Sequence, residues 1–520
     1  MSRIRPLVVS RRGAVSAGDP LAAAAGARVL AEGGNAIDAA VTAAAILTVV
    51  HPQACSVGGD GFTLIATDGR IVGINASGPA PAAADRSMFP DGIPKLGARC
   101  STVPGVVDGW AKALSDYGTK TLGEALAPAI EFAEGGFPVH PRLIEWLGRS
   151  RANLDQGGGG NCPFLPEGRI PALGSLVRQP ELAEVLRRVA EGGRDAYYRG
   201  EVAKKLVQGL RAGGGYFSEE DFAGHACRVV EPLSAPYRGM TFYQMPPNSW
   251  GLLMLMQLRV LEGPDVGGMG HNTAQTLHHL IEAQRVCFEA GRPHIADPDF
   301  ADVPLGELLS EGMANQLRAR IDPNRAGGPG LGEPPGGTTY VAAMDDQGNA
   351  VSHILSVFQL FGSGFIPKGT GVLMNNRLSG FTLEAGHPNE LAPGKRPAHT
   401  LSPAMAAKDG KSIIAFGSPG AAAQTVTLVQ IALNLVDFGM DPQSAIEAPR
   451  WTVDAKGDRR LECGIPQEVR QKLRAMGHEF EMPEEGFLLF GSVKVVLRDA
   501  TTGALFAGAD FRRNGYAVGV

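Results

Sequence analysis

Residues 336–340 read GGTTY, and the chain continues to residue 364 as VAAMDDQGNAVSHILSVFQLFGSG. Two glycines thus precede a pair of threonines, and the threonines open a run typical of a β-strand. If the chain is cut before Thr338, that residue gains a free α-amine beside its own hydroxyl. An α-amine titrates at about pH 8, so some of it is unprotonated at neutral pH and can accept the hydroxyl proton. The stretch predicts an N-terminal threonine nucleophile made by one cleavage, although an ordinary strand start would read the same.

Further motifs stand in a fixed order on both sides of this stretch. Before it lie GDPLAAAAGARVLAEGGNAIDAAVTAAAILTVVHPQACSVGGDGF, STVPGVVDGW and TLGEALAPAIEFAEGGFPV. After it come GTGVLMNNR, GKRPAHTLSPAMAAKDGK, FGSPGAAAQ and IEAPRW. In this order, over nearly the whole chain, they resemble the γ-glutamyltransferase (glutathione hydrolase) family of N-terminal-nucleophile hydrolases. The resemblance implies an α+β fold of four layers, the αββα sandwich.

The composition favours one large folding unit. Of the 520 residues, 44% are hydrophobic and 19% are charged, which is usual for a globular protein with a sizeable core. No stretch between the motifs has the composition of a linker. The resemblance implies that residues 1–337 form a large α subunit and residues 338–520 a small β subunit within this unit. The glycine- and proline-rich run at 325–337 is typical of a surface loop. It is equally compatible with a flexible segment that lets the two new chain ends move apart after cleavage.

Charge and hydropathy exclude several classes of partner. The net charge is −5 and no dense run of Lys and Arg is present, so neither nucleic acid nor an anionic membrane surface is an expected partner. The most apolar stretch, residues 36–50, contains Asp38 and is shorter than the roughly 20 residues of a membrane span. We expect a buried helix there. The N-terminal residues lack the apolar run of a signal peptide, which predicts a soluble, cytoplasmic protein.

Cysteine spacing and glycine motifs point to no cofactor. The six cysteines are widely spread, with no CxxC pair and no zinc-type spacing, so we expect free buried thiols and no metal. GGDGF at 58–62 is neither a P-loop nor a dinucleotide-binding motif. The expected partner is a small molecule. The six cysteines of the chain are Cys55, Cys100, Cys162, Cys227, Cys287 and Cys463.

Local signals place helices before Thr338 and mainly strands after it. Asp19 and Pro20 suit the N-cap and first position of a helix. Helical spacing of apolar residues recurs between 120 and 290, whereas short apolar or alternating runs dominate from Thr338 onward. The residues DDQGN at 345–349 predict a turn between the first two strands.

The resemblance assigns the catalytic positions. It places the nucleophile at Thr338, with Thr339 as the alternative, and the scissile bond after Gly337. A second hydroxyl that hydrogen-bonds the nucleophile falls at Ser356, eighteen residues later. The family's oxyanion turn reads GSPGA here, so the amides of Gly420 and Ala421 are the expected donors. Ala421 replaces the second glycine of the family's turn and keeps the backbone amide. We expect this amide to donate to the oxyanion if the φ angle of Ala421 is negative.

Positions that bind the γ-glutamyl group in the family carry other residues here. Ser77 replaces the arginine that grips the α-carboxylate. Phe358, Arg377 and Gly380 replace the residues that bind the α-amino group. Arg377 is a fixed cation with a planar fork of donors, and it favours a substrate carboxylate or another acidic group.

Other assignments of the substrate-site residues remain open. Arg377 would equally suit an ion pair with a protein carboxylate such as Glu384. Two family serines are replaced by His399 and Thr400, which become candidate substrate-binding residues, although a structural role suits His399 as well. His353, inside a strand, is expected to serve packing.

Together these residues predict a self-cleaving amidohydrolase with a ping-pong mechanism and no cofactor. The replaced pocket resembles that of the cytoplasmic oxamate amidohydrolase-like members, which implies a small, acidic amide as substrate. A glutathione hydrolase or γ-glutamyltransferase that binds its donor through other residues is the alternative. A third possibility is an uncleaved, inactive binding protein. Cleavage would give an α/β heterodimer, and further dimerisation is left open.

Overall fold

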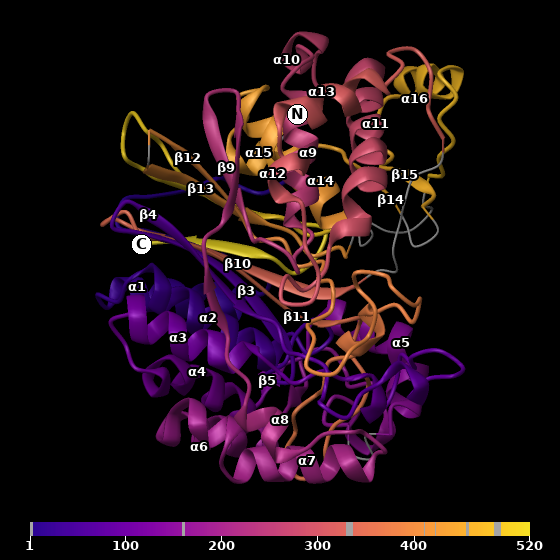
Figure 1. Ribbon diagram of the computed structural model, residues 1–520. Coiled ribbons are helices and arrows are strands. Elements are labelled where there is room, and N and C mark those ends of the chain that lie inside the picture. The colour runs from indigo at the N-terminus through magenta and orange to yellow at the C-terminus, as the bar shows by residue number, and fades with distance from the viewer. Residues whose placement is uncertain are drawn as a thin grey trace.

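The computed structural model describes residues 4–158, 162–328, 336–409, 411–421, 423–453, 457–482 and 490–520. Two seven-stranded sheets pack face to face, and a layer of helices covers the outer face of each sheet (Figure 1). The predicted αββα sandwich is therefore confirmed. Most of the glycine- and proline-rich run before Thr338, residues 329–335, lies outside the described ranges.

The sheet that contains Thr338, here called the nucleophile sheet, is antiparallel in every pairing. Its two central strands are β10 and β11, which pair as a hairpin. In order across the sheet the strands are β18 (Tyr516–Gly519), β2 (Gly13–Ala17), β10 (Gly337–Asp345), β11 (Ala350–Phe358), β3 (Asp60–Thr67), β4 (Arg70–Ala76) and β7 (Arg228–Val230).

The second sheet is also antiparallel and is built mostly from C-terminal strands. Its order is β1 (Val8–Ser10), β17 (Leu505–Ala509), β16 (Lys494–Arg498), β13 (Lys411–Gly417), β12 (Ala404–Lys408), β9 (Met240–Gln244) and β8 (Leu233–Tyr237). Two small ribbons lie outside the sheets, β5 (Phe137–Pro138) with β6 (Leu176–Val177) and β14 (Trp451–Val453) with β15 (Arg459–Leu461).

Helices divide between the two outer layers by their place in the sequence (Figure 1). The nucleophile sheet is covered by α1 (Pro20–Ala31), α2 (Ala36–Val50), α3 (Val106–Tyr117) and α4 (Leu122–Gly135), with α5 (Pro141–Gln156), α6 (Pro180–Tyr198), α7 (Glu201–Ala212) and α8 (Glu219–Ala223) beyond them. On the other side lie α9 (Gly251–Leu261), α10 (Val266–Met269), α11 (Ala274–Gly291), α12 (Leu305–Leu308), α13 (Glu311–Ala319), α14 (Ala423–Val436), α15 (Pro442–Glu447) and α16 (Gln467–Ala475).

Several local predictions hold. Asp19 caps α1, since its carboxylate accepts the Leu21 amide hydrogen at 2.9 Å. Helix α2 covers the predicted residues 36–50, and every one of them is buried. The predicted turn joins β10 to β11, closed by a hydrogen bond from the Asp345 amide to the Asn349 carbonyl at 3.2 Å. No helix in the described part of the chain has the length and apolar character of a membrane span.

All six cysteines are free thiols, as predicted, but their burial is not uniform. Cys463 is exposed, so the expectation of buried thiols is wrong at that position. Cys55, Cys100 and Cys287 are buried, whereas Cys162 and Cys227 are partly buried.

The alternation of side chains along β10 decides which threonine faces which layer. Tyr340, Ala342 and Met344 point into the core between the two sheets. Val341 and Ala343 point the other way, into the core beneath the helices. Because successive residues of a strand face opposite sides, Thr338 belongs to the inter-sheet face and Thr339 to the helix face.

Candidate active site

Thr338 and Ser356 face each other across the first residues of the β10–β11 hairpin. They are direct register partners, and the register shifts between Gly337 and Thr338. The Thr338 hydroxyl donates to Ser356 Oγ over 3.2 Å, and both side chains are buried. The hairpin register thus brings together the two hydroxyls that the sequence placed eighteen residues apart.

The Ser356 hydroxyl also contacts the bond that is predicted to break. It donates to the carbonyl oxygen of Gly337, and its oxygen accepts the Phe358 amide hydrogen at 2.8 Å. A donor on a carbonyl oxygen stabilises the negative charge that develops there during nucleophilic attack. One serine therefore touches both the Thr338 hydroxyl and the carbonyl group of Gly337.

Thr339 is in different surroundings. A Cβ added at Gly18 would lie 2.1 Å from Thr339 Oγ1 and 3.3 Å from His51 Nδ1, so this hydroxyl packs beneath the helix layer. Its Oγ1 has no hydrogen-bond partner within the described ranges. The arrangement favours Thr338 over Thr339 as the nucleophile, because only Thr338 has a hydroxyl partner.

The predicted oxyanion turn lies directly before α14. The Gly420 and Ala421 carbonyls accept the first helical hydrogen bonds, both at 3.0 Å, from Ala423 and Gln424. The amide ends of a helix carry partial positive charge, which suits an oxyanion. A Cβ added at Gly336 would lie 3.3 Å from the Ala421 Cβ, so the turn abuts the chain just before the bond that is predicted to break.

One expectation about this turn is wrong. The φ angle of Ala421 is +50°, in the left-handed region, and not negative. Such a conformation costs an alanine roughly 1–2 kcal/mol, which the surrounding contacts must offset. The amide N–H is retained in either conformation.

Asp60, which the sequence analysis did not single out, lies in the same row of the sheet. It is the register partner of Ser356 on β3. Its Oδ1 accepts the Gly78 amide hydrogen at 2.9 Å. Its Oδ2 lies 3.3 Å from His399 Nε2 and 3.6 Å from Arg377 Nε, and all three side chains are 0% exposed. An acidic residue inside the glycine run GGDGF was the signal available in the sequence.

These contacts give Arg377 and His399 partners within the protein. Arg377 pairs with a protein carboxylate, but the partner is Asp60 and not Glu384. Burial, and then the charge of Arg377, lower the pKa of His399 to about 4. His399 is therefore neutral at neutral pH, and a proton on Nε2 lets it donate to Asp60.

Ser77 is held by neighbouring amides. Its hydroxyl donates to Asn75 Oδ1 at 2.7 Å and accepts from Asn248 Nδ2 at 3.2 Å. Its carbonyl accepts from Arg396 Nε at 3.0 Å. Ser77 therefore anchors the buried Arg396, a cation near this position that the sequence analysis missed. His353 is also hydrogen-bonded, since its Nε2 accepts from Trp110 Nε1 at 3.2 Å.

A cavity of about 650 Å³ lies beside these residues. Phe358, Gly380 and Thr400 line it, whereas Thr338, Arg377 and His399 do not. Gln359 also lines it, and a Cβ added at Gly337 would lie 2.6 Å from the Gln359 carbonyl oxygen. Gly337 therefore packs against a residue that lines this cavity. Its other walls include Trp250, Phe288, Ile295, Phe381 and Ala398.

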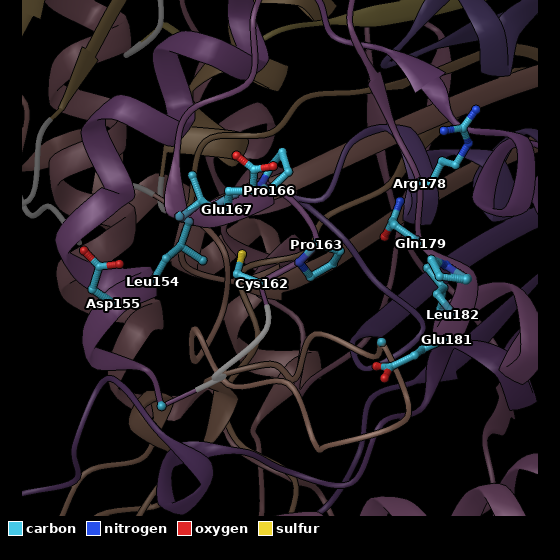
Figure 2. A pocket seen from close by; sticks show the side chains of 15 residues that line it. Leu154, Asp155, Cys162, Pro163, Pro166, Glu167, Arg178, Gln179, Glu181 and Leu182 are labelled. Atoms are coloured by element: carbon cyan, nitrogen blue, oxygen red, sulfur yellow. The ribbon is translucent and has the colours of Figure 1, made fainter.

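A larger cavity of about 820 Å³ lies elsewhere, along α5 and the start of α6 (Figure 2). Cys162, Glu167 and Arg178 are among its lining residues, and none of the predicted site residues is. In the part of the chain that the structure describes, no group of three or more His, Cys, Asp or Glu side chains could hold a metal ion.

Comparisons with known proteins agree on the family and differ on the substrate. The family profile described as Gamma-glutamyltranspeptidase matches residues 22–520. The chain is 37% identical to the glutathione hydrolase-like YwrD proenzyme of Bacillus subtilis, over 96% of this chain and 97% of that protein. It is 34% identical to the oxamate amidohydrolase proenzyme of Klebsiella pneumoniae, over 98% and 99% of the two chains.

A solved structure extends the similarity to the whole fold. The cephalosporin acylase from Bacillus halodurans superposes with a TM-score of 0.94 at 34% sequence identity, covering 100% of this chain and 98% of that one. The names of these similar proteins refer to different amide substrates, so similarity alone does not select one.

Proposed function

Because the chain belongs to the gamma-glutamyltranspeptidase family of N-terminal-nucleophile hydrolases, we propose that it cuts its own Gly337–Thr338 bond and then hydrolyses a small amide through an acyl-enzyme on Thr338. The observation that carries this proposal is the position of Ser356. Its hydroxyl lies 3.2 Å from the nucleophile and donates to the Gly337 carbonyl. The B. subtilis and K. pneumoniae relatives are both named as proenzymes, which supports the cleavage step.

In the proposed maturation step, Thr338 Oγ1 attacks the carbonyl carbon of Gly337. The bond between that carbon and the Thr338 nitrogen breaks, and the hydroxyl proton ends on the nitrogen, which becomes a free α-amine. Water then hydrolyses the resulting ester and leaves a carboxylate on Gly337. The products are an α subunit of residues 1–337 and a β subunit of residues 338–520.

In the proposed turnover, the new α-amine accepts the proton of the Thr338 hydroxyl as it attacks the substrate amide. The amides of Gly420 and Ala421 face the developing oxyanion, supported by the N-terminus of α14. Water releases the acyl group, and an amine is the less favoured acceptor. The mechanism is ping-pong and uses no metal or organic cofactor.

For the substrate, we propose a small amide with an acidic group that is recognised near Arg377, His399 and Thr400. Arg377 supports this proposal as a fixed cation. A second candidate, a γ-glutamyl compound such as glutathione, is favoured by the carboxylate of Asp60 beside Arg377. Asp60 could pair with the ammonium group of such a substrate, and Arg377 with its carboxylate. A cytoplasmic location stays a prediction.

Rates on oxamate and on a γ-glutamyl anilide distinguish the two candidates. The proposal predicts a higher kcat/KM for oxamate. Faster turnover of the γ-glutamyl compound would select the second candidate. A protein that cleaves itself but turns over neither compound would refute both substrate classes and leave the maturation step standing. A protein that never cleaves and turns over neither compound would be the uncleaved binding protein.

A further inference from the structure

The predicted oxyanion turn has a backbone conformation that its surroundings must hold. Gly420 has a φ of +149° and Ala421 a φ of +50°, both in regions that L side chains rarely adopt. An alanine in such a conformation is strained, and strain of this kind persists only where the surrounding structure fixes it. Among the described residues, no partner accepts the Gly420 or the Ala421 amide hydrogen. The contacts around the turn therefore indicate what aims these two amides.

A segment beside the turn provides the main contacts. Residues 490–494, here called the supporting segment, lead into β16. β16 pairs antiparallel with β13, and Lys494 lies opposite Gly417, so the supporting segment runs alongside the turn that follows Gly417. The buried Arg450 fixes the segment, since its Nη1 donates to the Phe490 carbonyl at 2.8 Å. The turn therefore has a firmly held neighbour.

Ser418 connects the supporting segment to the turn. It is 0% exposed, and its Oγ accepts the Ser492 amide hydrogen at 3.1 Å. The same hydroxyl donates to the Pro419 carbonyl at 2.9 Å. The Ser418 hydroxyl thus acts once as an acceptor and once as a donor, and both of its partners are backbone groups.

Two further contacts tighten this connection. The Lys494 ammonium donates to the Ser492 carbonyl at 2.8 Å and to Ser492 Oγ at 3.0 Å. A Cβ added at Gly491 would lie 2.8 Å from the Pro419 carbonyl oxygen and would also overlap Ser418 Oγ, so the backbone of Gly491 packs directly against both. Close packing of this kind leaves the Pro419 carbonyl little room to turn.

The Ser418 hydroxyl also determines the direction of the Gly420 amide. The Pro419 carbonyl and the Gly420 N–H belong to one planar, trans peptide group, in which the two point in opposite directions. The carbonyl points toward the Ser418 hydroxyl, since it accepts a hydrogen bond from it. The Gly420 N–H therefore points away from Ser418, which leaves it available to a ligand.

We propose that Ser418 is a positioning residue that aims the Gly420 amide at the oxyanion of the acyl-transfer reaction, with Ser492 and Lys494 holding Ser418 in place. The inference rests on the proposed function and adds to it the residues that keep the oxyanion site in shape. Ser418 acts through the peptide group and not by touching the substrate. Without its hydroxyl the Gly420 amide remains, but the peptide group can turn, so the transition state loses more than the bound substrate does.

The first test measures turnover by the cleaved enzyme. Ser418→Ala is expected to lower kcat by about tenfold or more on the faster of oxamate and the γ-glutamyl anilide, with KM changed by less than about threefold, because the oxyanion forms only in the transition state. Self-cleavage is expected to continue, because the Gly337 carbonyl has Ser356 as its own donor. If the alanine protein does not accumulate, Ser418→Cys keeps the volume with a weaker donor and is expected to lower kcat less.

Two further serine variants separate positioning from packing. Ser16 is also 0% exposed and donates to the Gly508 carbonyl at 2.8 Å, so Ser16→Ala loses a comparable hydrogen bond and should keep kcat near wild type. Ser492→Ala keeps the backbone amide that donates to Ser418, so its kcat should fall less than that of Ser418→Ala. An equal loss in Ser16→Ala and Ser418→Ala would contradict a specific role of Ser418.

The second test measures the oxyanion site by binding. Phenylboronic acid is expected to bind Thr338 covalently. The hydroxyl oxygen of Thr338 adds to boron, its proton passes to the α-amine, and one hydroxyl group of the tetrahedral boronate occupies the place of the oxyanion. Benzoate has the same ring but a planar carboxylate, and it forms no such adduct. In calorimetry with cleaved protein, Ser418→Ala is expected to weaken phenylboronic acid about tenfold and to leave benzoate unchanged.

The outcomes distinguish this inference from the proposed function. If Ser418→Ala matches the wild type in kcat and in affinity for phenylboronic acid, the role of Ser418 is overturned and the proposed function stands. Equal weakening of phenylboronic acid and benzoate would show general disruption of the site and would also overturn that role. A cleaved wild-type protein that turns over neither amide and does not bind phenylboronic acid would refute the proposed function, and this inference with it.

Discussion

The hydroxyl oxygens of Thr338 and Ser356 lie 3.2 Å apart at the open end of the β10–β11 hairpin. The register of the hairpin sets this relationship, since it pairs the two residues directly and places both on the face between the sheets. Ser356 also donates to the Gly337 carbonyl. The Ser356 hydroxyl therefore contacts both the proposed nucleophile and the bond that breaks in the proposed maturation step.

Replacing Thr338 is expected to stop both reactions. Thr338→Ala removes the attacking oxygen, so the chain should stay uncut and amide hydrolysis should fall by several orders of magnitude. Denaturing gels and a rate assay measure the two effects. Thr339→Ala is the control and should still be cut, because its hydroxyl lies beneath the helix layer. Normal cleavage of the Thr338→Ala protein would contradict this assignment.

Ser356→Ala is expected to slow self-cleavage. Loss of one donor to a developing oxyanion costs roughly 3–4 kcal/mol, or about a hundred- to a thousandfold in rate. Ser356→Thr keeps the hydroxyl and should cleave at a rate much closer to wild type. Ser352→Ala is a matched control on the same strand, because its hydroxyl contacts Tyr340 Oη at 2.7 Å and not the scissile bond. Equal cleavage rates in Ser356→Ala and Ser352→Ala would refute the role of Ser356.

Asp60→Asn is expected to destabilise the fold. The change removes the carboxylate that lies beside the buried guanidinium of Arg377, and breaking a buried pair in this way costs about 3–5 kcal/mol. Urea unfolding of the uncleaved Thr338→Ala protein, with and without the change, measures the difference. Asp68→Asn, in the exposed turn after β3, should have almost no effect. A neutral result for Asp60→Asn would mean that the pair with Arg377 contributes little.

Lys494 makes stability depend on pH. Its ammonium is buried and donates to Ser492 Oγ at 3.0 Å, and burial together with Arg513 lowers its pKa from 10.5 to about 7. Above pH 7 the unfolded chain binds more protons than the folded one, so stability should rise with pH. The slope is at most about 1.4 kcal/mol per pH unit, and the burial penalty is fully present below pH 7.

This rise is best measured between about pH 7 and 8, because at higher pH the thiols of the unfolded chain, with an ordinary pKa of about 8.5, also lose protons. Urea unfolding of the Thr338→Ala protein avoids the added titration of a new α-amine. Lys494→Met should remove the pH slope and stabilise the protein at pH 7. A slope that persists in Lys494→Met would assign the effect to other groups.

The ordered motifs of the sequence predicted the fold, which the structure confirms, and they also place the proposed nucleophile at Thr338. The alternating runs after Thr338 predicted the hairpin, and its register then determined the contact with Ser356. The turn at Ala421 does not meet the condition of a negative φ, since tertiary contacts and not local preference hold that residue at +50°.

The buried ion pair could not be predicted in the same way. Asp60 and Arg377 are more than three hundred residues apart in the sequence, and no local pattern relates them. Only the placement of β3 beside β11 brings Asp60 opposite Ser356. Glu384, the example given of a carboxylate partner, is close to Arg377 in the sequence, whereas Asp60 at the start of β3 is the carboxylate that lies beside it.

Intact mass spectrometry of freshly purified and aged wild-type protein, with N-terminal sequencing of the smaller fragment, tests the central claim most directly. We predict two fragments that together account for the 54.4 kDa chain plus one water, with the smaller fragment beginning at Thr338. A single uncut chain that is active on amides would contradict the account, as would a smaller fragment that begins at any other residue.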